Sequence, residues 1–422
     1  MSNIPQPLQG MSDIYTPEVE VWQTLESRAR DVLSRYDFRE VRTPIVEMAS
    51  VYLHSLGDTS DIVQKQMYAF ETRGGKQVCL RPEGTAGVMR HLAGRGQEAQ
   101  DARLYYMGPM FRAERPQAGR RRQFHQLGVE CMGAAAPAQD AEVIALQAAL
   151  FSAWELGEVR FELNTRGSAE DFPKILAGLR AALAPHKADL CEDCQRRMDS
   201  NVLRVLDCKV PGCRDLVADL PQITTWMDPA SLTYFDDVRR SLDLLGVDYE
   251  VNPLLVRGLD YYQHTIWEVT SRALGAQDAL SGGGRYHMEM GKAGLDGVGF
   301  GIGMERVLLA LSDAAKSAFA ADAVPLVVLV AQNDAARTEN LRLAAGLRAA
   351  GVRVRMDLSG KSMKAQMKAA SRWQAGWVLI RGESELTAGT VQARDMADSS
   401  QMEVTLDQVL PHISKSLLPK EG

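Results

Sequence analysis

The chain has 422 residues, of which 45% are hydrophobic and 24% charged, and its formal net charge is −6 at pH 7. These values are typical of a globular, water-soluble protein with two or three domains. No apolar run approaches the ~20 residues that a membrane-spanning helix needs. The first residues also lack the basic and apolar regions of a secretory signal, so we expect a cytoplasmic protein with no membrane partner.

The first hundred residues predict a helix, an interrupted strand and a strand–turn–helix unit. Apolar residues such as Val21, Leu25 and Val32 recur at helical spacing between 18 and 36, which predicts an amphipathic helix. The stretch FREVRTPIVE suits a strand, but Pro44 cannot donate a ladder hydrogen bond and belongs at an edge or a junction. The stretch QVCLRPEGTAGVMRHL predicts a strand, a turn and a helix that starts near Thr85.

The next predicted unit is an antiparallel hairpin with an arginine-rich tip. Its strands are LYYMGPMFR and RRQFHQLGVECMG, and AERPQAGR connects them. Five arginines fall between positions 112 and 122, and on a hairpin tip they form either a solvated edge or an anion-binding surface. Arg112 lies on a predicted strand, so we expect it to point into a cleft toward an anion. Phosphate and carboxylate are the groups that a guanidinium binds best.

The middle of the chain changes character twice. A helix is predicted at about 138–156, and residues 170–250 are more helical and bear four cysteines, so we interpret them as an insertion. Two strands are then predicted in YEVNPLLVRGLDYYQHTIWEVTS, and GVGFGIGMERVLLAL predicts a glycine-rich strand that runs into a helix. Its glycines stand at every second residue, which suits a strand that a flat ligand approaches closely.

The last hundred residues differ from the rest in pattern and charge. Apolar strands alternate with helices after Pro325, which predicts a small parallel or mixed α/β domain. This segment has a net charge of +3, whereas the preceding 324 residues have −9. One predicted helix face is basic, which is either a solvated face or a surface that contacts phosphates. Its residues are Lys361, Lys364, Lys368 and Arg372.

Several of these stretches resemble, in order, the motifs of class II aminoacyl-tRNA synthetases and, among them, of the histidyl-tRNA synthetase family. FRAERPQAGRRRQFHQLGVE resembles the second class motif. FREVRTPIVE with Pro44 resembles the first, dimer-forming motif, and GVGFGIGMERVLL with Arg306 resembles the third. RGLDYYQHTIWEV and SGGGRY resemble signatures of the histidine family, and LRPEGTAG also fits. The family usually continues the second signature with Asp-Gly, whereas this chain has His287 and Met288.

The resemblance implies an α+β fold with a class II antiparallel sheet flanked by helices, a helical insertion and a C-terminal α/β anticodon-binding domain. We place the catalytic domain at 1–169 and 251–323, the insertion at 170–250 and the anticodon-binding domain at 324–422. The implied protein is a cytoplasmic homodimer. Its implied activity is the ATP-dependent attachment of L-histidine to histidine tRNA through a histidyl-adenylate, with release of AMP and pyrophosphate.

The resemblance also assigns side chains to the groups of the substrate histidine. An ammonium needs carboxylate and hydroxyl acceptors, and the two imidazole nitrogens need separate partners. A pocket built from such groups rejects analogues that leave them unpaired. The implied residues are Glu83, Thr85 and Gln126 for the ammonium, Glu130 and Tyr262 for the imidazole, and Tyr261 and Tyr286 as walls.

ATP and the tRNA acceptor end have their own implied residues. Arg112 and Arg257 are the implied catalytic pair that clamps the α-phosphate, and Mg²⁺ is expected on the outer phosphates. The carboxylate nucleophile is already ionised at neutral pH, so this step needs no general base. The implied ATP-binding residues are Arg112, Glu114, Arg121 and Arg306. The implied acceptor-end residues are Arg115, Gln117 and Arg120. Adenine is the flat ligand expected beside the alternating glycines.

The four cysteines of the insertion resemble a zinc knuckle in part. Cys191 and Cys194 are separated by two residues, but Cys208 and Cys213 are separated by four, which departs from a simple CxxC pair. We therefore expect reduced structural thiols rather than zinc. A metal at this position would hold the insertion together and take no part in chemistry.

Two other functions compete with tRNA charging. Some relatives of the family keep the fold and bind histidine as a regulatory subunit of histidine biosynthesis, and they tend to lose the ATP-binding arginines and the tail domain. This chain keeps Arg112, Arg257, Arg306 and the tail, which favours the synthetase. A pure RNA-binding module leaves the RGLDYY and RPEGTAG stretches unexplained.

Overall fold

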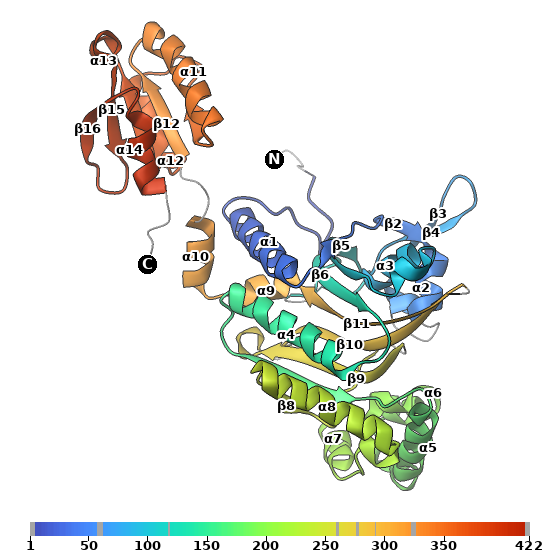
Figure 1. Ribbon diagram of the computed structural model, residues 1–422. Helices are drawn as coiled ribbons and strands as arrows, with labels where there is room; N and C mark the ends of the chain where they lie inside the picture. The colour runs from blue at the N-terminus through green and yellow to red at the C-terminus, as the bar shows by residue number, and fades with distance from the viewer. Residues whose placement is uncertain are drawn as a thin grey trace. The chain divides into compact units, whose positions relative to one another are not determined.

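The chain forms two compact units, Met1–Lys316 and Ser317–Gly422, which are described separately (Figure 1). The domain boundary expected between residues 323 and 324 lies outside the described residues. No helix in the described residues combines the length and apolar character needed to cross a membrane. The computed structural model describes residues 5–56, 62–116, 119–258, 261–275, 278–291, 293–321 and 326–417.

The first unit is built on a sheet of eight strands. Neighbouring strands among the central six are antiparallel, and the two edge strands pair in parallel. The sheet confirms the expected antiparallel core and the arginine-bearing hairpin of β5 and β6. In spatial order its strands are β1 (Arg39–Glu40), β5 (Arg103–Phe111), β6 (Gln123–Met132), β11 (Ala293–Gly303), β10 (Ala279–Met290), β9 (Tyr262–Ser271), β7 (Val159–Thr165) and β8 (Glu250–Val251).

Three long helices lie along one face of this sheet (Figure 1). They are α1 (Glu18–Arg35), α4 (Pro137–Ala153) and α8 (Pro229–Leu245). Helix α1 buries Val21, Leu25 and Val32, the face that helical spacing predicts. Burial of such a stripe against the sheet is the main source of stability for an amphipathic helix.

A buried ion pair fixes α4 to the sheet. Arg285 Nε on β10 donates to Asp140 Oδ1 on α4 at 2.7 Å, and Thr265 and Tyr234 donate to Asp140 Oδ2 at 2.6 and 3.0 Å. Consecutive strand residues point to opposite faces, so Tyr286 projects to the other side of the sheet. Strand β10 continues unbroken through His287 and Met288 to Met290, although these residues depart from the family pattern.

The opposite side of the sheet carries a smaller layer. A second sheet has the order β2-β4-β3, and the strand expected across FREVRTPIVE is split into β1 and β2 on either side of Pro44. The elements of this layer are β2 (Val46–Met48), α2 (Ala49–Leu56), a π-helical turn (Ile62–Gln66), β3 (Tyr68–Glu71), β4 (Gln77–Leu80) and α3 (Thr85–Leu92). A 3₁₀ turn, Gly96–Ala99, follows them, and α9 (Met304–Ala310) and α10 (Asp313–Ala321) follow β11.

The predicted insertion is a group of short helices with its own apolar core. Its α-helices precede α8, which packs on α4 as part of the main body. The helices of the insertion are α5 (Asp171–Leu183), α6 (Glu192–Ser200) and α7 (Pro211–Ala218), with 3₁₀ segments η3 (Ala184–Asp189), η4 (Val202–Val205) and η5 (Ile223–Trp226) between them.

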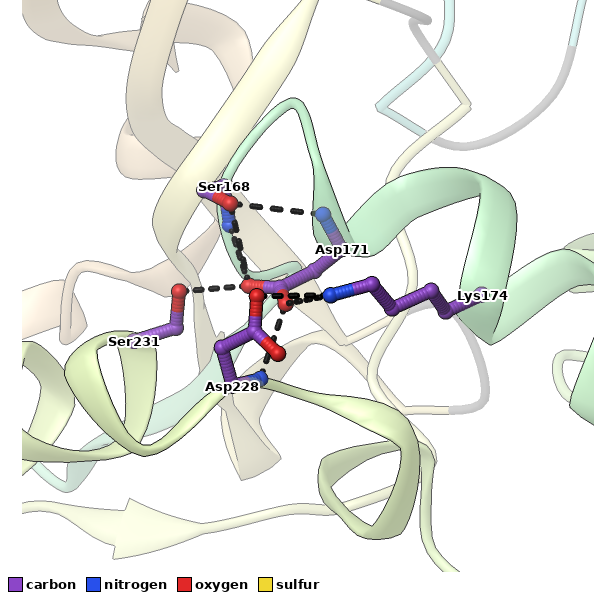
Figure 2. Close-up of polar contacts among 5 residues, drawn as sticks. All are labelled: Ser168, Asp171, Lys174, Asp228 and Ser231. Carbon is purple, nitrogen blue, oxygen red and sulfur yellow. Dashed lines mark hydrogen bonds and ion pairs between the residues drawn. The ribbon is translucent and has the colours of Figure 1, made fainter.

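A polar cluster joins the two ends of the insertion (Figure 2). The Asp171 carboxylate, at the start of α5, accepts hydrogen bonds from the Ser168 amide at 2.9 Å, the Asp228 amide at 2.8 Å and the Ser231 hydroxyl at 2.5 Å. Lys174 Nζ bonds Asp228 Oδ2 at 2.6 Å. These five residues are called the Asp171 cluster below. The cluster ties the start of α5 to the start of α8, so the insertion leaves and rejoins the main body at one place.

The second unit is a mixed five-stranded sheet with helices. Strands β13, β12 and β14 are parallel, and β14, β15 and β16 are antiparallel, which confirms the expected α/β architecture. In spatial order the strands are β13 (Arg353–Met356), β12 (Leu326–Ala331), β14 (Trp377–Arg381), β15 (Thr390–Asp395) and β16 (Gln401–Thr405). The helices are α11 (Asp334–Ala349), α12 (Met363–Arg372), α13 (Glu383–Ala388) and α14 (Val409–Leu417).

Candidate active site

One pocket of the first unit brings together all seven residues implied to bind histidine, along with Arg112 and Arg257. Its cavity volume is about 100 Å³. The lining comes from α3, the β5–β6 hairpin, β9, β10 and β11, which are far apart in the sequence. The lining residues are Glu83, Thr85, Arg112, Gln126, Glu130, Arg257, Tyr261, Tyr262, Gly282, Tyr286, Gly299, Phe300 and Gly301.

Alternating glycines on β11 make room for side chains of the neighbouring strands. A Cβ atom at Gly299 would lie 2.5 Å from Glu130 Oε2, and one at Gly301 would lie 2.3 Å from Gln126 Nε2. Both distances are shorter than a Cβ contact allows, so only glycine lets these two polar groups lie over the strand. At these positions the glycines therefore accommodate the chain's own carboxylate and amide. The sequence suggested a flat ligand over these glycines, and it did not predict that side chains of β6 would lie over them.

Glu130 is a buried carboxylate with an incomplete set of partners. Tyr286 donates its hydroxyl to Glu130 Oε2 at 2.6 Å. Within the described part of the chain, Oε1 has no partner at hydrogen-bonding distance and angle, although Thr85 lies near enough to lower the pKa somewhat. Burial dominates and raises the pKa of Glu130 to about 8. The free pocket thus holds a carboxyl oxygen to which a ligand could donate the missing hydrogen bond.

Glu83 and Thr85 are placed by the start of α3. Glu83 is 4% exposed, and its carboxylate accepts the amide hydrogens of Thr85 at 2.7 Å and Ala86 at 2.8 Å. Burial raises the pKa of Glu83, and these two amide bonds partly offset the effect. A negative charge at a helix N-terminus is also favoured by the helix dipole. The local fold therefore fixes an acidic group at the edge of the pocket.

Aromatic rings form the walls of the pocket. The Tyr261 ring lies 4.7 Å from the Tyr262 ring and 5.7 Å from the Tyr286 ring, measured between centroids. The Tyr261–Tyr286 pair is edge-to-face, a geometry that aromatic quadrupoles favour. Tyr286 was expected to serve as a wall alone, but its hydroxyl also orients Glu130.

Two arginines enter the pocket from different elements. Arg257 Nη1 pairs with Glu268 Oε2 on β9 at 2.7 Å, and its guanidinium lies over Gly282, where a Cβ would be 2.2 Å away. Arg112 Nε donates to the Pro82 carbonyl oxygen at 2.9 Å. Both arginines also line the pocket. The sequence did not lead us to expect Glu268 as the partner of Arg257. Glu268 is an even number of residues from Tyr262 on the same strand, which places both side chains on the same face of the sheet.

A second cavity of about 110 Å³ lies between the arginine-bearing hairpin and α9. It brings together Glu114, Arg121 and Arg306, the other residues implied to bind ATP, and Arg120 also lines it. Arg121 Nη1 contacts Ser12 Oγ at 2.6 Å. Three guanidinium groups around one cavity make a site suited to anions.

The remaining implied residues lie on the connection between β5 and β6. Arg115 and Arg120 are exposed, as a surface that meets a large polyanion requires. Gln117 lies outside the described residues. The structure therefore places two of the three implied acceptor-end residues on an accessible surface beside the second cavity.

The fold and pocket match the class II aminoacyl-tRNA synthetase architecture that the motifs resemble, and comparison with known proteins identifies the family. A family model described as Histidyl-tRNA synthetase matches residues 10–307, and one described as Anticodon binding domain matches residues 326–416. Because the first match covers more than half of the chain, the chain belongs to the histidyl-tRNA synthetase family.

Individual relatives agree with this assignment over nearly the full length. The chain is 41% identical over 425 residues to a histidine–tRNA ligase of Bacillus cytotoxicus, covering 97% of this chain and 99% of the relative. It is 42% identical over 405 residues to a histidine–tRNA ligase of Trichlorobacter lovleyi, covering 95% and 96%. The crystal structure of apo S. aureus histidyl-tRNA synthetase superposes with a TM-score of 0.79 at 29% identity, covering 97% and 99%.

Proposed function

We propose that the chain is an enzyme that attaches L-histidine to histidine tRNA in two steps. ATP and histidine first give histidyl-adenylate and pyrophosphate, and the histidyl group then passes to the tRNA 3′ end with release of AMP. The observation that carries this proposal is the pocket itself. It joins two buried carboxylates and three tyrosines to two arginines, which matches a substrate with two cationic or N–H-bearing groups and one carboxylate. Translation uses the product, so cytoplasm is the proposed compartment.

The histidine side chain binds at the Glu130 end of this pocket. Glu130 Oε1 and the Tyr262 hydroxyl bind the two imidazole nitrogens, while Tyr261 and Tyr286 flank the ring. Tyr286 holds Glu130 Oε2 at 2.6 Å, which leaves Oε1 for the ligand. The unpartnered Oε1 atom and the raised pKa of Glu130, about 8, support this assignment.

The ammonium group binds to a second set of polar groups in the pocket. Glu83, Thr85 and Gln126 supply a carboxylate, a hydroxyl and an amide oxygen. Gln126 lines the pocket, and its Oε1 atom has no hydrogen-bond partner among the described residues. A buried amide oxygen without a partner costs free energy, and the substrate ammonium removes that cost by donating to it.

Arg112 and Arg257 clamp the α-phosphate and the histidine carboxylate during adenylation. Histidine's carboxylate is ionised at neutral pH, so it attacks the α-phosphorus without a general base and pyrophosphate leaves. The chain's contribution is orientation and stabilisation of developing negative charge. Arg257 keeps Nη1 on Glu268, an anchor that fixes the guanidinium before the substrates bind.

The rest of ATP occupies the second cavity. Glu114 places the adenine end, and Arg121 and Arg306 bind phosphates. Mg²⁺ accompanies the β- and γ-phosphates. In the described ranges, the cysteines of the insertion are the one group of three or more histidine, cysteine or acidic side chains gathered closely enough to hold a metal. The proposed Mg²⁺ therefore takes its ligands chiefly from the nucleotide and water.

tRNA contacts two surfaces in this proposal. The acceptor end meets Arg115, Gln117 and Arg120 on the β5–β6 connection. The anticodon binds the C-terminal domain, proposed at 324–422, whose basic stripe is exposed on and just before α12. Neutralised phosphates release counterions, so this contact weakens as salt rises. The proposed catalytic domain is 1–169 and 251–323, and the proposed insertion is 170–250.

The active form is a homodimer. Five large apolar side chains around the small β2-β4-β3 sheet are between 39% and 46% exposed. A cluster of that kind on a water-exposed surface is typical of a protein–protein interface. Sedimentation should show a dimer at micromolar concentration, and a fully active monomer would contradict it. These side chains are Ile45, Val46, Met48, Leu53 and Phe70.

Histidine-dependent exchange of labelled pyrophosphate into ATP tests the proposed function. The expected result is exchange with L-histidine and none above background with the other amino acids. No exchange with histidine, or equal exchange with several amino acids, would refute it. The alternative, a regulatory subunit that binds histidine without charging tRNA, predicts histidine binding without exchange. The retained Arg112, Arg257 and Arg306 argue against that alternative.

A further inference from the structure

The four cysteines of the insertion converge on one point. Cys191 caps α6 and Cys194 lies in its first turn, Cys208 follows η4, and Cys213 lies in the first turn of α7. All four Sγ atoms lie within 4.8 Å of one another. We propose that Cys191, Cys194, Cys208 and Cys213 form a structural zinc site, which the proposed function does not require.

The distances fit a tetrahedral metal better than a disulfide. Zinc–sulfur bonds of ~2.3 Å place the sulfurs of a tetrahedral site ~3.8 Å apart, and Cys191 Sγ lies 3.9 Å from Cys208 Sγ. A disulfide needs sulfurs ~2.05 Å apart, and all four thiols are free in the structure. Four cysteine ligands fill all positions of a tetrahedral zinc ion and leave none for water or substrate. The site would therefore be structural rather than catalytic.

The surroundings of the sulfurs suit thiolates. The Cys191 amide donates to Cys213 Sγ at 3.2 Å, and such a hydrogen bond stabilises charge on a metal-bound sulfur. Cys194 and Cys213 both lie in the first turn of a helix, where the positive end of the helix dipole favours a thiolate. The chain thus provides thiolate stabilisation from the backbone.

The expectation of thiols without metal rested on the spacing of the second cysteine pair. The pair Cys208–Cys213 has four intervening residues rather than two. The turn after Cys208 and the start of α7 take up the extra length and return Cys213 Sγ to the cluster. Spacing along the chain is therefore a weaker guide here than the packing of α6, η4 and α7.

Zinc would stabilise the part of the insertion that packs against the loop containing Arg257 and Gly258. The segment between Cys194 and Cys208 carries Arg204, whose Nη2 lies 2.8 Å from the position of a Cβ at Gly258. Gly258 follows Arg257 directly, and Val256 packs on the core of the insertion. Metal binding adds its free energy to folding of such a segment, and so it holds the surface on which the Arg257 loop rests.

Metal analysis of the full-length protein tests the proposal. Protein purified without chelators should contain one zinc per chain by mass spectrometry, and Cys194→Ser and Cys213→Ser should reduce zinc to background. Cys79→Ser is the matched control, because Cys79 is a buried cysteine of β4 outside the cluster, and it should retain the zinc. The zinc-bound wild type should also melt at a higher temperature than the same protein after zinc removal.

A second measurement does not depend on the variants folding. Wild-type protein stripped of zinc and loaded with cobalt(II) should show the visible absorption of a tetrahedral site with thiolate-to-metal charge transfer. Absence of that spectrum together with four freely titrating cluster thiols would overturn the proposal. Two disulfides in place of the thiols, or full zinc content in both serine variants, would overturn it as well.

Discussion

The substrate pocket and the Asp171 cluster both contain buried carboxylates, but these carboxylates differ in how many hydrogen-bond donors the chain itself provides for them. Asp171 accepts bonds from two amides and two hydroxyls (Figure 2). Burial would raise its pKa, but the hydrogen bonds from Ser231, Asp228 and Ser168 outweigh burial and lower it. Among the described residues, Tyr286 donates the one hydrogen bond that Glu130 accepts with good geometry, and burial raises the pKa of Glu130 to about 8.

The difference separates groups that hold the fold from groups that await a ligand. A buried polar group without a partner costs about 1–3 kcal/mol, and a bound ligand that supplies the partner removes this cost. Glu130 Oε1 and Gln126 Oε1 both lack partners among the described residues and both face the pocket. The Asp171 cluster supplies its own partners, and its role is therefore structural. Substitutions in the pocket should therefore lower the rate of adenylate formation or histidine use, whereas substitutions in the Asp171 cluster should lower the stability of the fold.

The largest expected effect is on Arg257. Lysine keeps the charge but cannot span two oxygens with a planar fork. Arg257→Lys should lower the rate of adenylate formation about 100- to 1000-fold, or ~3–4 kcal/mol, as loss of a preorganised donor does, while substrate binding weakens less. Pre-steady-state adenylate formation measures it.

Arg272→Lys is the matched control for this substitution, because Arg272 pairs with Glu158 on the surface and its replacement should leave the rate unchanged. The competing explanation is that Arg257 serves only to pair with Glu268. In that case Arg257→Lys would retain a rate within about threefold, a barrier change under ~0.7 kcal/mol, and melt at a lower temperature.

The next effect is on Glu130. Glu130→Gln keeps an acceptor for the Tyr286 hydroxyl but, above the folded pKa of about 8 where Glu130 is ionised, removes the charge that binds the imidazole. A hydrogen bond to a charged group contributes about 1.5–3 kcal/mol, so kcat/KM for histidine should fall roughly 10- to 150-fold. Pyrophosphate exchange at varied histidine concentration measures it, with the exposed Glu71→Gln as control. An unchanged kcat/KM would remove Glu130 from the imidazole site.

Asp171 should show the reverse behaviour. Asp171→Asn turns one acceptor into an amide that faces the donors of Ser231, Ser168 and Asp228, so the free energy of unfolding should fall by about 1.5–3 kcal/mol. Below the melting transition, pyrophosphate exchange should stay within about threefold. Urea or thermal unfolding measures the loss, with Asp199→Asn, an exposed change in the same insertion, as control. A normal stability with lost exchange would contradict the structural role.

The last expected effect is the pH dependence of stability. The folded pKa of Glu130 is raised, so the stability it contributes is full below the unfolded pKa of ~4.3 and is lost as pH rises toward 8. Glu130→Gln should therefore melt higher than wild type at pH 8, with the gap closing toward pH 5. The folded pKa of Asp171 is lowered, so the deficit of Asp171→Asn should shrink as pH falls below ~4. Parallel gaps at all pH values would contradict both.

Much of the fold was visible in the sequence because local patterns determine it. The spacing of Val21, Leu25 and Val32 predicted α1, and the run LVVLVA predicted β12. Pro44 predicted the break between β1 and β2. Elements β15, β16, α13 and α14 were not predicted, since their segments are short and the strands are fixed by pairing within the sheet.

The pocket residues were identified through family motifs, while their couplings needed the structure. Nothing in the spacing joins Tyr286 to Glu130, which are 156 positions apart, or Asp171 to Ser231, which are 60 apart. Such pairs arise when folding brings together elements that are distant in the sequence. Glu268 is the exception, since its even spacing from Tyr262 on a predicted strand gave a usable signal. The roles of the pocket residues remain predictions.

A crystal structure of the protein with L-histidine tests most directly whether the unpartnered atoms of the pocket belong to the ligand. We predict the imidazole within hydrogen-bonding distance of Glu130 Oε1 and the ammonium within reach of Gln126 Oε1, with every contact of the Asp171 cluster unchanged. Histidine bound elsewhere, with both oxygens still lacking partners, would contradict the account.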